Sequence, residues 1–538
     1  MKYAFVIDQR KCIGCHACTV ACKAEHDVPI GVNRTWVKYI EKGVFPNTRR
    51  YFLVNRCNHC DDAPCVAICP TKALYKRGDG IVDFDAARCI GCKSCMQACP
   101  YDALYIDPSS NTAAKCNYCA HRTEIGLEPA CVVVCPEQAI IAGDMHNPTT
   151  QIARIIAREP VRVRKPEQGT GPNVYYLGAD EAAINPEAAV EDLPHMSMWS
   201  TILKPHHEDE AAIDMGKSLR GPAHLRALQA YRPLEAGRRE TAEAHIVYDA
   251  PRNTAPWGWR VSAYLGTKAV AAGVMMMAAL VVALYGLSGT TNALLGIGAP
   301  VIAGLFTSIT LVLLIADLKR PDRALFLLTK GNPTSWLVWG GYILALFGLI
   351  EAACFALGLL GFAAGLRWLL LPGALLGIAA AGYSAFLFGQ AEGRDFWQSP
   401  LLLPILIVQA VMAGAATLGL LAWALGSESN VGTLLAAVLL AAVALHMLLV
   451  LFEVFGPHSN SHVVAAARYM SRGPLRDTFW GPCIVVGSLI PLVLLCIALL
   501  VPGEASHALR GFAGLFALAG LFAYEHCFVV AGQSVPLS

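Results

Sequence analysis

Apolar residues are distributed very unevenly along this 538-residue chain. Between residues 262 and 533 they form eight stretches, each about as long as the roughly 20 residues that a helix needs to cross a bilayer. Because the backbone N–H and C=O groups of such a segment must pair within it, each stretch is predicted to be a transmembrane helix. The predicted spans are 262–286, 293–317, 335–360, 367–389, 400–425, 432–456, 481–501 and 509–532.

Residues 1 to about 260 have a different character. They mix charged, apolar, glycine and proline residues, which indicates a soluble domain fused to the membrane domain. Residues 179–256 are polar and show no sustained helical or strand period, so they are predicted to be a connector. A connector of this length is unusual, and we expect it to wrap around the soluble domain or to cover part of a partner.

Charge and the first residues narrow the function classes. The net charge is +2, with no basic tract interleaved with aromatic residues, so nucleic acid is not a predicted partner. The opening MKYAFVIDQRKC has neither the apolar core of a signal peptide nor a twin arginine. We therefore expect no export signal of the chain's own, while export with the signal of a partner stays open.

Cysteine carries the chemistry. The chain has 20 cysteines, and 16 of them lie before residue 136 in four similar runs. Each run opens with two cysteines separated by two residues, and three of the runs close on a Cys-Pro pair. This is the ligand pattern of bacterial ferredoxins. The runs are Cys12, Cys15, Cys18, Cys22; Cys57, Cys60, Cys65, Cys69; Cys89, Cys92, Cys95, Cys99; and Cys116, Cys119, Cys131, Cys135.

The spacing suits an iron-sulfur cubane. Three thiolates from one tight loop hold three corners of a cluster, and a distant cysteine closes the fourth, with the last cysteine of each run ligating the neighbouring cluster. Four runs therefore predict two such pairs, or four [4Fe-4S] clusters. The alternatives fit less well, because disulfide frameworks are typical of short secreted chains and zinc sites use paired CxxC knuckles.

Longer stretches resemble a known family. CIGCHACTVACKAEHDVPIG, CNHCDDAPCVAICPTKAL, GIVDFDAARCIGCKSCMQACPYDA and KCNYCAHRTEIGLEPACVVVCP resemble the four-cluster electron-transfer subunit of the dimethyl sulfoxide and polysulfide reductase family, over residues 1–178. The resemblance implies that the first and fourth runs exchange their last cysteines, as do the second and third. The implied ligand sets are Cys12, Cys15, Cys18, Cys135; Cys22, Cys116, Cys119, Cys131; Cys57, Cys60, Cys65, Cys99; and Cys69, Cys89, Cys92, Cys95.

The membrane half resembles a second family. DLKRPDRALFLLTKGNPTSWLVWG and GYSAFLFGQAEGRDFWQSP are similar to the NrfD-like membrane anchor of polysulfide reductase, over about 250–538. That resemblance implies a haem-free, eight-helix subunit that exchanges electrons with the quinone pool. The predicted fold is thus an α+β two-part chain: a double bacterial-ferredoxin-like iron-sulfur domain at 1–178, a connector at 179–256 and an all-α transmembrane domain at 257–538.

Haem is not predicted in the membrane domain. A haem b between helices needs paired axial ligands, commonly two histidines. Within the predicted spans only His446 and His526 are available, and they lie on different helices.

A quinone pocket is expected near the iron-sulfur face, where a cluster can reach the ring and water can exchange protons. An alternative role for Asp317 and Arg323 is to pair with each other and fasten their loop. The candidate residues are Tyr264, Lys268, Asp317, Arg323, Asn332, Ser335 and Trp336.

Ionisable residues within a bilayer are costly and are therefore functional candidates. We predict a proton path through Glu351, His446, Glu453 and Glu525. His446 and Glu453 are seven residues apart and share a helix face. The alternative is that a neighbour neutralises each group and the pair only fixes helix packing.

Loop charge indicates the side of the membrane. Eight basic residues lie in loops on the iron-sulfur side, whereas the opposite loops have Arg367 and Arg510. We expect a protein of the prokaryotic cytoplasmic (inner) membrane, and this count favours an iron-sulfur domain in the cytoplasm, unless the eight serve contact or quinone chemistry. They are Lys319, Arg320, Arg323, Lys330, Arg394, Arg468, Arg472 and Arg476.

Together these features predict a non-catalytic subunit of a molybdopterin-type oxidoreductase. It passes electrons between a separate catalytic subunit and a membrane quinone such as menaquinone, and residues 1–150 contain nothing else that resembles a catalytic apparatus. Two alternatives stay open: a redox-driven proton-translocating module, and a quinone-linked complex with a cytochrome partner. The substrate of the catalytic subunit is not encoded in this chain.

Overall fold

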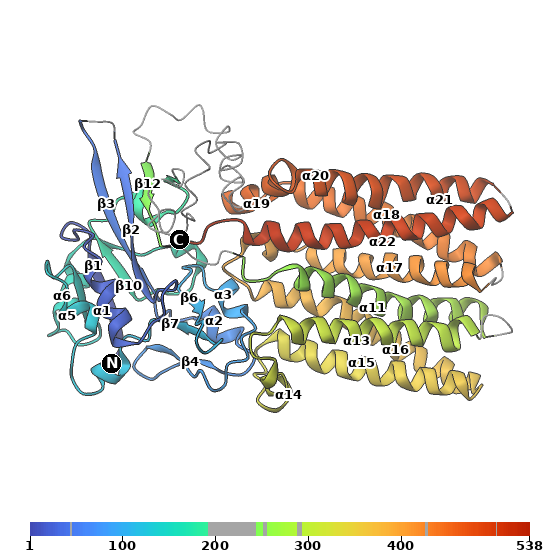
Figure 1. Cartoon of the computed structure of the whole chain (residues 1–538), viewed down its shortest axis with the longest axis horizontal. Coiled ribbons are helices and arrows are strands. Elements are labelled where there is room, and N and C mark those ends of the chain that lie inside the picture. The colour runs from blue at the N-terminus through green and yellow to red at the C-terminus, as the bar shows by residue number, and fades with distance from the viewer. Residues whose placement is uncertain (44–45, 192–243, 251–254, 288–292, 426–428, 502) are drawn as a thin grey trace, which may run out of the picture.

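The computed structural model describes residues 1–43, 46–191, 244–250, 255–287, 293–425, 429–501 and 503–538. An α+β domain forms one end of the molecule, and a bundle of long helices forms the other (Figure 1). We call the end of the bundle that touches the α+β domain the near face and the opposite end the far face.

Two small sheets and two hairpins build the α+β domain. In the first sheet, with strand order β8-β1-β10-β9, strand β1 runs parallel to β10 and antiparallel to β8. Short helices lie between the strands and follow the cysteine runs. The strands are β1 (Tyr3–Asp8), β2 (Thr35–Lys42), β3 (Arg49–Arg56), β4 (Leu74–Lys76), β5 (Val82–Phe84), β6 (Leu104–Ile106), β7 (Ala113–Lys115), β8 (Ile140–Asp144), β9 (Val161–Arg162), β10 (Val174–Leu177), β11 (Val190–Glu191) and β12 (Ala244–Tyr248). The helices are α1 (Ala17–Glu25), α2 (Pro64–Ala67), α3 (Ser94–Ala98), α4 (Ala120–Thr123), α5 (Ala130–Val133), α6 (Gln151–Arg158), η1 (Pro166–Gln168) and α7 (Glu181–Ile184).

The predicted connector contributes to the second sheet, which has the order β11-β12-β2-β3. Strand β12 pairs antiparallel with β2, and β11 pairs parallel with β12. Both ends of the connector therefore lie on the iron-sulfur domain, and its middle, residues 192–243, falls outside the described residues. Strands of two and five residues are too short to produce the sustained period on which the sequence prediction relied.

All eight predicted spans are present as helices long and apolar enough to cross a membrane, counted over the residues described. The largest boundary differences are at the last two, which begin at Arg476 and Glu504 where 481 and 509 were predicted. Two spans include π-helical turns, and short helices occupy the near-face loops. The elements are α11 (Trp259–Tyr285), η3 (Ala293–Gly298) continuing into α13 (Ala299–Asp317), η4 (Pro321–Arg323), α14 (Phe326–Thr329), α15 (Trp336–Leu359), α16 (Ala363–Gly389), η5 (Asp395–Gln398), α17 (Leu402–Ala424), α18 (Ser429–Phe455), α19 (Ser461–Ser471), α20 (Arg476–Thr478), η6 (Phe479–Leu489) continuing into α21 (Ile490–Leu500), and α22 (Glu504–Gln533).

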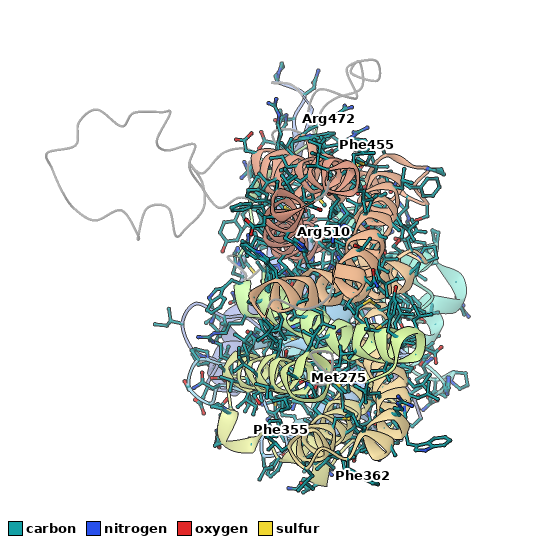
Figure 2. The ribbon with its side chains drawn as sticks, turned by 90° about the vertical axis from the view of Figure 1, so that its right-hand side faces the viewer. Met275, Phe355, Phe362, Phe455, Arg472 and Arg510 are labelled. Carbon is teal, nitrogen blue, oxygen red and sulfur yellow. The ribbon has the colours of Figure 1, made fainter. Side chains whose placement is uncertain are left out.

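The bundle has two halves. Helices α11, α13, α15 and α16 form the first, and α17, α18, α21 and α22 form the second, with α11 packing against α17 and α22 across the boundary. Figure 2 looks along the helices and shows Phe355 and Phe362 in the first half and Phe455 and Arg510 in the second.

Glycine pairs bring the helices into close contact. A Cβ atom on Gly273 of α11 would lie 1.7 Å from the carbonyl oxygen of Ala410, and one on Gly414 of α17 would lie 2.1 Å from the backbone of Gly273. Small residues at a crossing allow two backbones to approach, which is the main source of packing attraction between helices in lipid.

We expect Gly414→Val to destabilise the membrane domain by about 1–3 kcal/mol, because the added methyl groups must displace the backbone of α11. Thermal unfolding in detergent measures the change. The control is Gly419→Val on the same helix, where a Cβ meets no atom within 4 Å and the midpoint should stay the same. Equal midpoints for the two variants would contradict the close crossing.

Candidate functional site

The sixteen cysteines of the α+β domain gather into four thiol sets, each combining three cysteines of one run with the last cysteine of another. Cys12, Cys15, Cys18 and Cys135 line one cavity, and Cys69, Cys89, Cys92 and Cys95 line another. The thiols of the other two sets are neighbours in the same crossed manner, with Cys22 near Cys116 and Cys99 near Cys57. The sets are set 1 (Cys12, Cys15, Cys18, Cys135), set 2 (Cys22, Cys116, Cys119, Cys131), set 3 (Cys57, Cys60, Cys65, Cys99) and set 4 (Cys69, Cys89, Cys92, Cys95).

Burial raises the pKa of several of these thiols and so keeps them from ionising unaided. It raises the pKa of Cys18 to about 12, and the thiols of Cys131 and Cys12 beside it add to the effect although Arg56 opposes it. Burial likewise raises the pKa of Cys92 to about 12. Thiolates gathered this closely need a bound cationic group to offset their mutual repulsion, and iron supplies that charge in a cluster.

The four CxxC loops share one backbone feature that sequence reasoning missed. In every loop the residue before the second cysteine has a left-handed conformation: Gly14 with φ 72°, His59 with 46°, Gly91 with 67° and Tyr118 with 62°. Such values are uncommon for His and Tyr, so the surrounding structure must hold them in place. The repeated geometry indicates four loops shaped for the same kind of ligand.

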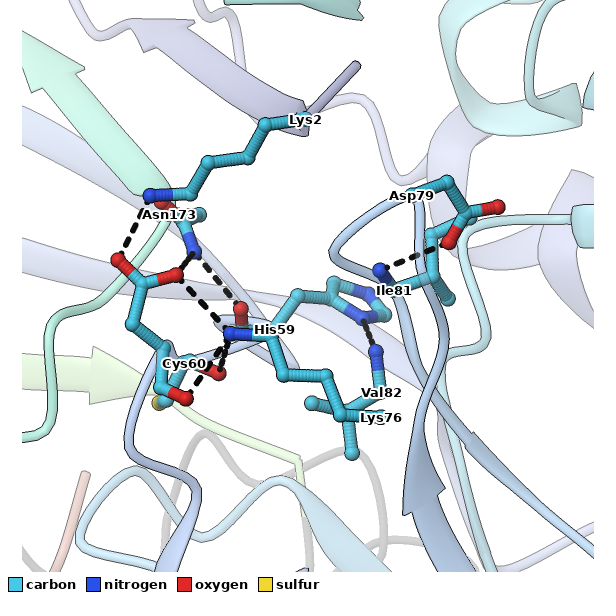
Figure 3. A network of polar contacts seen from close by, with 9 residues as sticks. Lys2, His59, Cys60, Lys76, Asp79, Ile81, Val82 and Asn173 are labelled. Carbon is cyan, nitrogen blue, oxygen red and sulfur yellow. Dashed lines mark hydrogen bonds and ion pairs between the residues drawn. The ribbon is translucent and has the colours of Figure 1, made fainter.

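Set 3 is fixed by a polar network that Figure 3 shows in close-up. The backbone N–H of Val82 donates to Nδ1 of His59 at 3.1 Å, and Asn173 Nδ2 donates to the carbonyl oxygen of His59 at 2.8 Å. Lys76 Nζ donates to the carbonyl oxygen of Cys60 at 3.0 Å. These bonds tie the loop to strands β4 and β5 and to Asn173, the residue before β10, and hold His59 in its unusual conformation.

A buried arginine lies between sets 1 and 2. Arg56 is 1% exposed, and its Nη1 donates to the sulfur of Cys131 at 3.3 Å. Its Nε and Nη2 have no hydrogen-bond partner in the part of the chain that the structure describes. Burial opposes its charge, but the sulfurs of Cys131, Cys116 and Cys18 outweigh burial and raise its pKa. A guanidinium left with unpaired donors at this depth requires an anionic neighbour, and an iron-sulfur cluster with four thiolate ligands is one.

Further donors point at sulfur. The backbone N–H groups of Gly91 and Ala113 donate to the sulfur of Cys89, and that of Ala139 donates to the sulfur of Cys135. Within the described residues, no three His, Cys, Asp or Glu side chains are placed to hold a single metal ion. Thiols spaced around a cavity, with donors aimed at their sulfurs, fit a cubane better than a mononuclear zinc site.

The four sets follow one another toward the membrane. Cys18 of set 1 neighbours Cys131 of set 2, Cys116 of set 2 neighbours Cys57 of set 3, and Cys65 of set 3 neighbours Cys95 of set 4. The order is therefore set 1, set 2, set 3, set 4.

Set 4 is bound directly by the membrane domain. Trp257 Nε1 donates to the carbonyl oxygen of Cys92 at 3.2 Å. Arg323 Nη1 donates to the carbonyl oxygen of Cys89 at 3.0 Å, and Asn332 Nδ2 donates to that of Cys69 at 2.9 Å. Three of the four cysteines of this set thus receive a hydrogen bond from the near face.

These contacts show what several predicted quinone residues do. The polar groups of Arg323 and Asn332 donate hydrogen bonds to the cysteine loops. The hydroxyl of Ser335 donates to the carbonyl oxygen of Ile68 at 2.8 Å. The ring of Trp336 stacks on Phe386. Asp317 does pair, but its partner is Lys93 of the α+β domain at 2.8 Å and not Arg323.

A cavity of about 470 Å³ opens beside this ion pair, and we call it the near-face cavity. Lys93, next to Cys92 in the sequence, lines it together with Asp317, Asn111, Trp259 and Arg260. Sequence reasoning missed Lys93, Trp259 and Arg260, because a cavity between two domains leaves no periodic signal in either.

The remaining candidates lie deeper. Lys268 is 2% exposed and donates to the carbonyl oxygen of Ala381 at 3.1 Å and to the hydroxyl of Ser384. Its ammonium group lies 5.9 Å from the centre of the Tyr264 ring.

The predicted proton path is divided between the two halves of the bundle. His446, Glu453 and Glu525 are buried in the second half, on helices α18 and α22. Glu351 is buried on α15 in the first half, where it accepts a hydrogen bond from Thr307 of α13 at 2.9 Å.

Known protein families match most of the iron-sulfur domain and most of the membrane domain. The 4Fe-4S dicluster domain family matches residues 11–74 in one version and 48–145 in another. The family described as polysulphide reductase, NrfD, matches residues 249–536, more than half of the chain. This protein belongs to the NrfD family.

Similar proteins match the iron-sulfur part of this NrfD-family chain. A tetrathionate reductase subunit of Salmonella typhimurium is 46% identical over 189 residues, which is 34% of this chain and 76% of the relative. A polysulfide reductase chain of Wolinella succinogenes is 41% identical over 33% of this chain and 94% of its own length. The arsenate respiratory reductase iron-sulfur subunit of a Shewanella species is 34% identical over 33% of this chain and 96% of the relative.

These matches confirm the two family resemblances that the sequence analysis identified. This NrfD-family chain is a fusion of a 4Fe-4S ferredoxin-like subunit with a multi-pass membrane anchor, and it serves as the electron-transfer and anchor subunit of an oxidoreductase complex.

We expect Arg56→Gln to lower the reduction potential of a cluster bound by set 1 or set 2. The variant removes a positive charge that stabilises the more negative, reduced state of the cluster. A redox titration followed by electron spin resonance measures the shift. Arg50→Gln is the control, since that arginine pairs with Glu41 on the surface. An unchanged titration of Arg56→Gln would mean that its unpaired donors do not face a cluster.

Proposed function

We propose that this chain carries four [4Fe-4S] clusters, one in each thiol set, and passes electrons between a molybdopterin-containing catalytic subunit and a membrane quinone. The observation that supports this most is the order of the sets. Set 1 is at the end away from the membrane helices, and set 4 is bound to the near face.

Quinone reacts in the near-face cavity. The cavity is beside Lys93, one residue from Cys92, so a quinone ring there lies close to the last cluster of the row. Its walls combine the apolar face of Trp259 with the charged groups of Asp317, Lys93 and Arg260. Pockets for small molecules commonly have this character: apolar walls with a few converging polar groups that fix orientation.

The Asp317 carboxylate is the acceptor that orients the quinol hydroxyl or exchanges its proton. Asp317→Asn should slow quinone reduction by on the order of tenfold or more while leaving electron entry into the clusters unchanged. The rate of quinone reduction by dithionite-reduced viologen, and cluster bleaching without quinone, measure the two steps. Asp322→Asn, an exposed partner of Arg320 on the same loop, should retain the wild-type rate. Loss of both steps in Asp317→Asn would instead indicate that the Lys93–Asp317 pair is structural.

The catalytic subunit docks on the opposite end, beside set 1. Cys15 is exposed there, and apolar side chains around α1, α4 and α5 are strongly exposed to solvent, such as Val20 at 64%, Ile30 at 86%, Ile125 at 73% and Val133 at 59%. Figure 1 shows α1 and α5 in the part of the domain that lies away from the membrane helices. A gathering of exposed apolar residues next to an exposed cluster ligand is typical of a docking surface for an electron-transfer partner.

We expect Val20→Asp combined with Ile30→Asp to reduce co-purification of the catalytic subunit on the order of tenfold, since a charge placed in an apolar interface must be desolvated. Quantifying the largest subunit in affinity-purified membranes provides the measurement. Tyr75→Asp, which changes an exposed aromatic residue on β4, serves as the control. Full retention of the partner by the double variant would place the docking surface elsewhere.

The membrane is the prokaryotic cytoplasmic membrane, with the iron-sulfur domain on the cytoplasmic side. Arg320, Arg323 and Arg394 donate to residues of the iron-sulfur domain, so these three of the eight near-face basic residues serve contact. Lys319 lies against Gly91 and lines the near-face cavity. The other four still outnumber Arg367 and Arg510 of the far face, which supports the orientation. Protease access to the iron-sulfur domain in spheroplasts and in inverted vesicles reports the side directly.

A further inference from the structure

Five polar side chains are buried together in and beside the second half of the bundle, and we call them the buried relay. They are Lys268 of α11, Gln409 of α17, His446 and Glu453 of α18, and Glu525 of α22. Each is at most 6% exposed. Ionisable groups at such depth are expensive and mark ion or proton pathways by default.

Direct contacts connect Gln409 with His446 and, through Tyr524, His446 with Glu453, whereas Lys268 and Glu525 are electrostatic neighbours. Gln409 Nε2 and His446 Nε2 are 3.2 Å apart, and the His446 ring lies edge-on against Tyr524 with centroids 5.2 Å apart. The hydroxyl of Tyr524 donates to Oε2 of Glu453 at 2.7 Å. Glu525, the next residue on α22, has Lys268, Glu453 and Gln409 as neighbours.

Several of these polar atoms have no hydrogen-bond partner within 3.5 Å among the residues that the structure describes. They are both carboxylate oxygens of Glu525, Oε1 of Glu453 and Oε1 of Gln409, all of them buried. Leaving such atoms unsatisfied costs about 1–3 kcal/mol each. Internal water is the usual remedy where two to four polar groups converge, as they do around Glu525. Water between these side chains also completes a chain along which a proton can move.

A second cavity, of about 620 Å³, reaches toward the relay from the far face, and we call it the far-face cavity. Glu504, His507 and Arg510 line its outer part on α22, and Ala416 of α17 and Leu439 of α18 line its inner part. Ala416 and Leu439 are each seven residues, roughly 10 Å along a helix, from Gln409 and His446 respectively. The small buried residues Ala413 and Ala442 lie on these two intervening segments.

The other end of the relay points toward the near-face cavity. Lys268 is one helical turn from Tyr264, and Tyr264 is one turn from Arg260, which lines that cavity. Side chains four residues apart on a helix lie on the same face. The far-face cavity, the relay and this face of α11 thus lie one after another between the far surface and the near-face cavity, with about 10 Å of buried apolar packing around Ala413 and Ala442 separating the far-face cavity from the relay.

We propose that Lys268, Glu525 and His446, the last oriented by Gln409, carry protons between the far-face cavity and the quinone in the near-face cavity. This inference rests on the proposed reaction of quinone there. Reduction of one quinone to quinol takes two electrons, which arrive from the iron-sulfur side, and two protons, which arrive from the far face. Charge therefore crosses the membrane with every turnover: quinone reduction moves positive charge from the far face toward the near face, and quinol oxidation moves it in the opposite direction.

The first half of the bundle offers a matched control. Glu351 is as deeply buried as Glu525, but it contacts Thr307 on α13 and lies on α15, which packs within the first half. Glu351→Gln and Glu525→Gln make the same chemical change at comparable depth, and only the second interrupts the relay.

The test uses the purified complex in quinone-containing liposomes with a pH-sensitive dye trapped inside. Methyl viologen reduced by dithionite is added outside, so electrons enter through outward-facing iron-sulfur domains and the far face points inward. Wild type and Glu351→Gln should reduce quinone, make the interior alkaline and build up an inside-negative potential. Glu525→Gln should abolish the internal pH change and slow quinone reduction by on the order of tenfold or more.

The outcomes separate the two proposals. No quinone reduction in wild type would refute the proposed function itself. Quinone reduction without an internal pH change, or with wild-type behaviour of Glu525→Gln, would refute the relay while leaving the proposed function intact. If Glu525→Gln loses its cluster absorbance and so fails to assemble, His446→Gln decides the question by the same readouts.

Discussion

The attachment of thiol set 4 to the membrane domain is the contact on which the rest of the molecule depends. Three cysteine carbonyls of this set accept hydrogen bonds from Trp257, Arg323 and Asn332. These bonds fix how far the last thiol set lies from the near face, and the proposed electron transfer between a cluster and a quinone depends on that separation. A Cβ on Gly91 in the same loop would lie 2.6 Å from Lys319 of the membrane domain, which shows how closely the two surfaces approach.

The interface also explains how charged residues are used at the near face. Lys93 pairs with Asp317, and Arg394 donates to the side chain of Gln97 at 2.8 Å. These groups are partly or wholly buried between the domains, where an unpaired charge would be costly. Arginines in these loops would indicate topology in an isolated membrane protein. Here they also bind the membrane domain to the iron-sulfur domain.

The two halves of the bundle differ in the polar groups that they bury. The first half holds Glu351 with one hydrogen-bond partner, whereas the second holds a connected group around Glu525 and His446. Helix α11 contacts both halves and brings Lys268 to this group. The near-face cavity thus has the row of thiol sets on one side and the buried polar side chains of the second half on the other, which is the arrangement on which the proposed electron and proton routes rest.

Sequence alone determined the elements whose signal is local. Apolar length defined eight spans, and CxxC spacing identified sixteen ligand candidates, because bilayer thickness and cluster size act over a few tens of residues. Only the tertiary structure decided which residues at the domain boundary meet. Arg323, Asn332 and Ser335 were correctly expected at the iron-sulfur face, yet they bind cysteine loops, while Lys93, Trp259 and Arg260 line the cavity. The tertiary structure also placed Glu351 and Glu525 in different halves of the bundle. The sequence could not do so, because two buried carboxylates look alike along a sequence and differ only in the helices that pack around them.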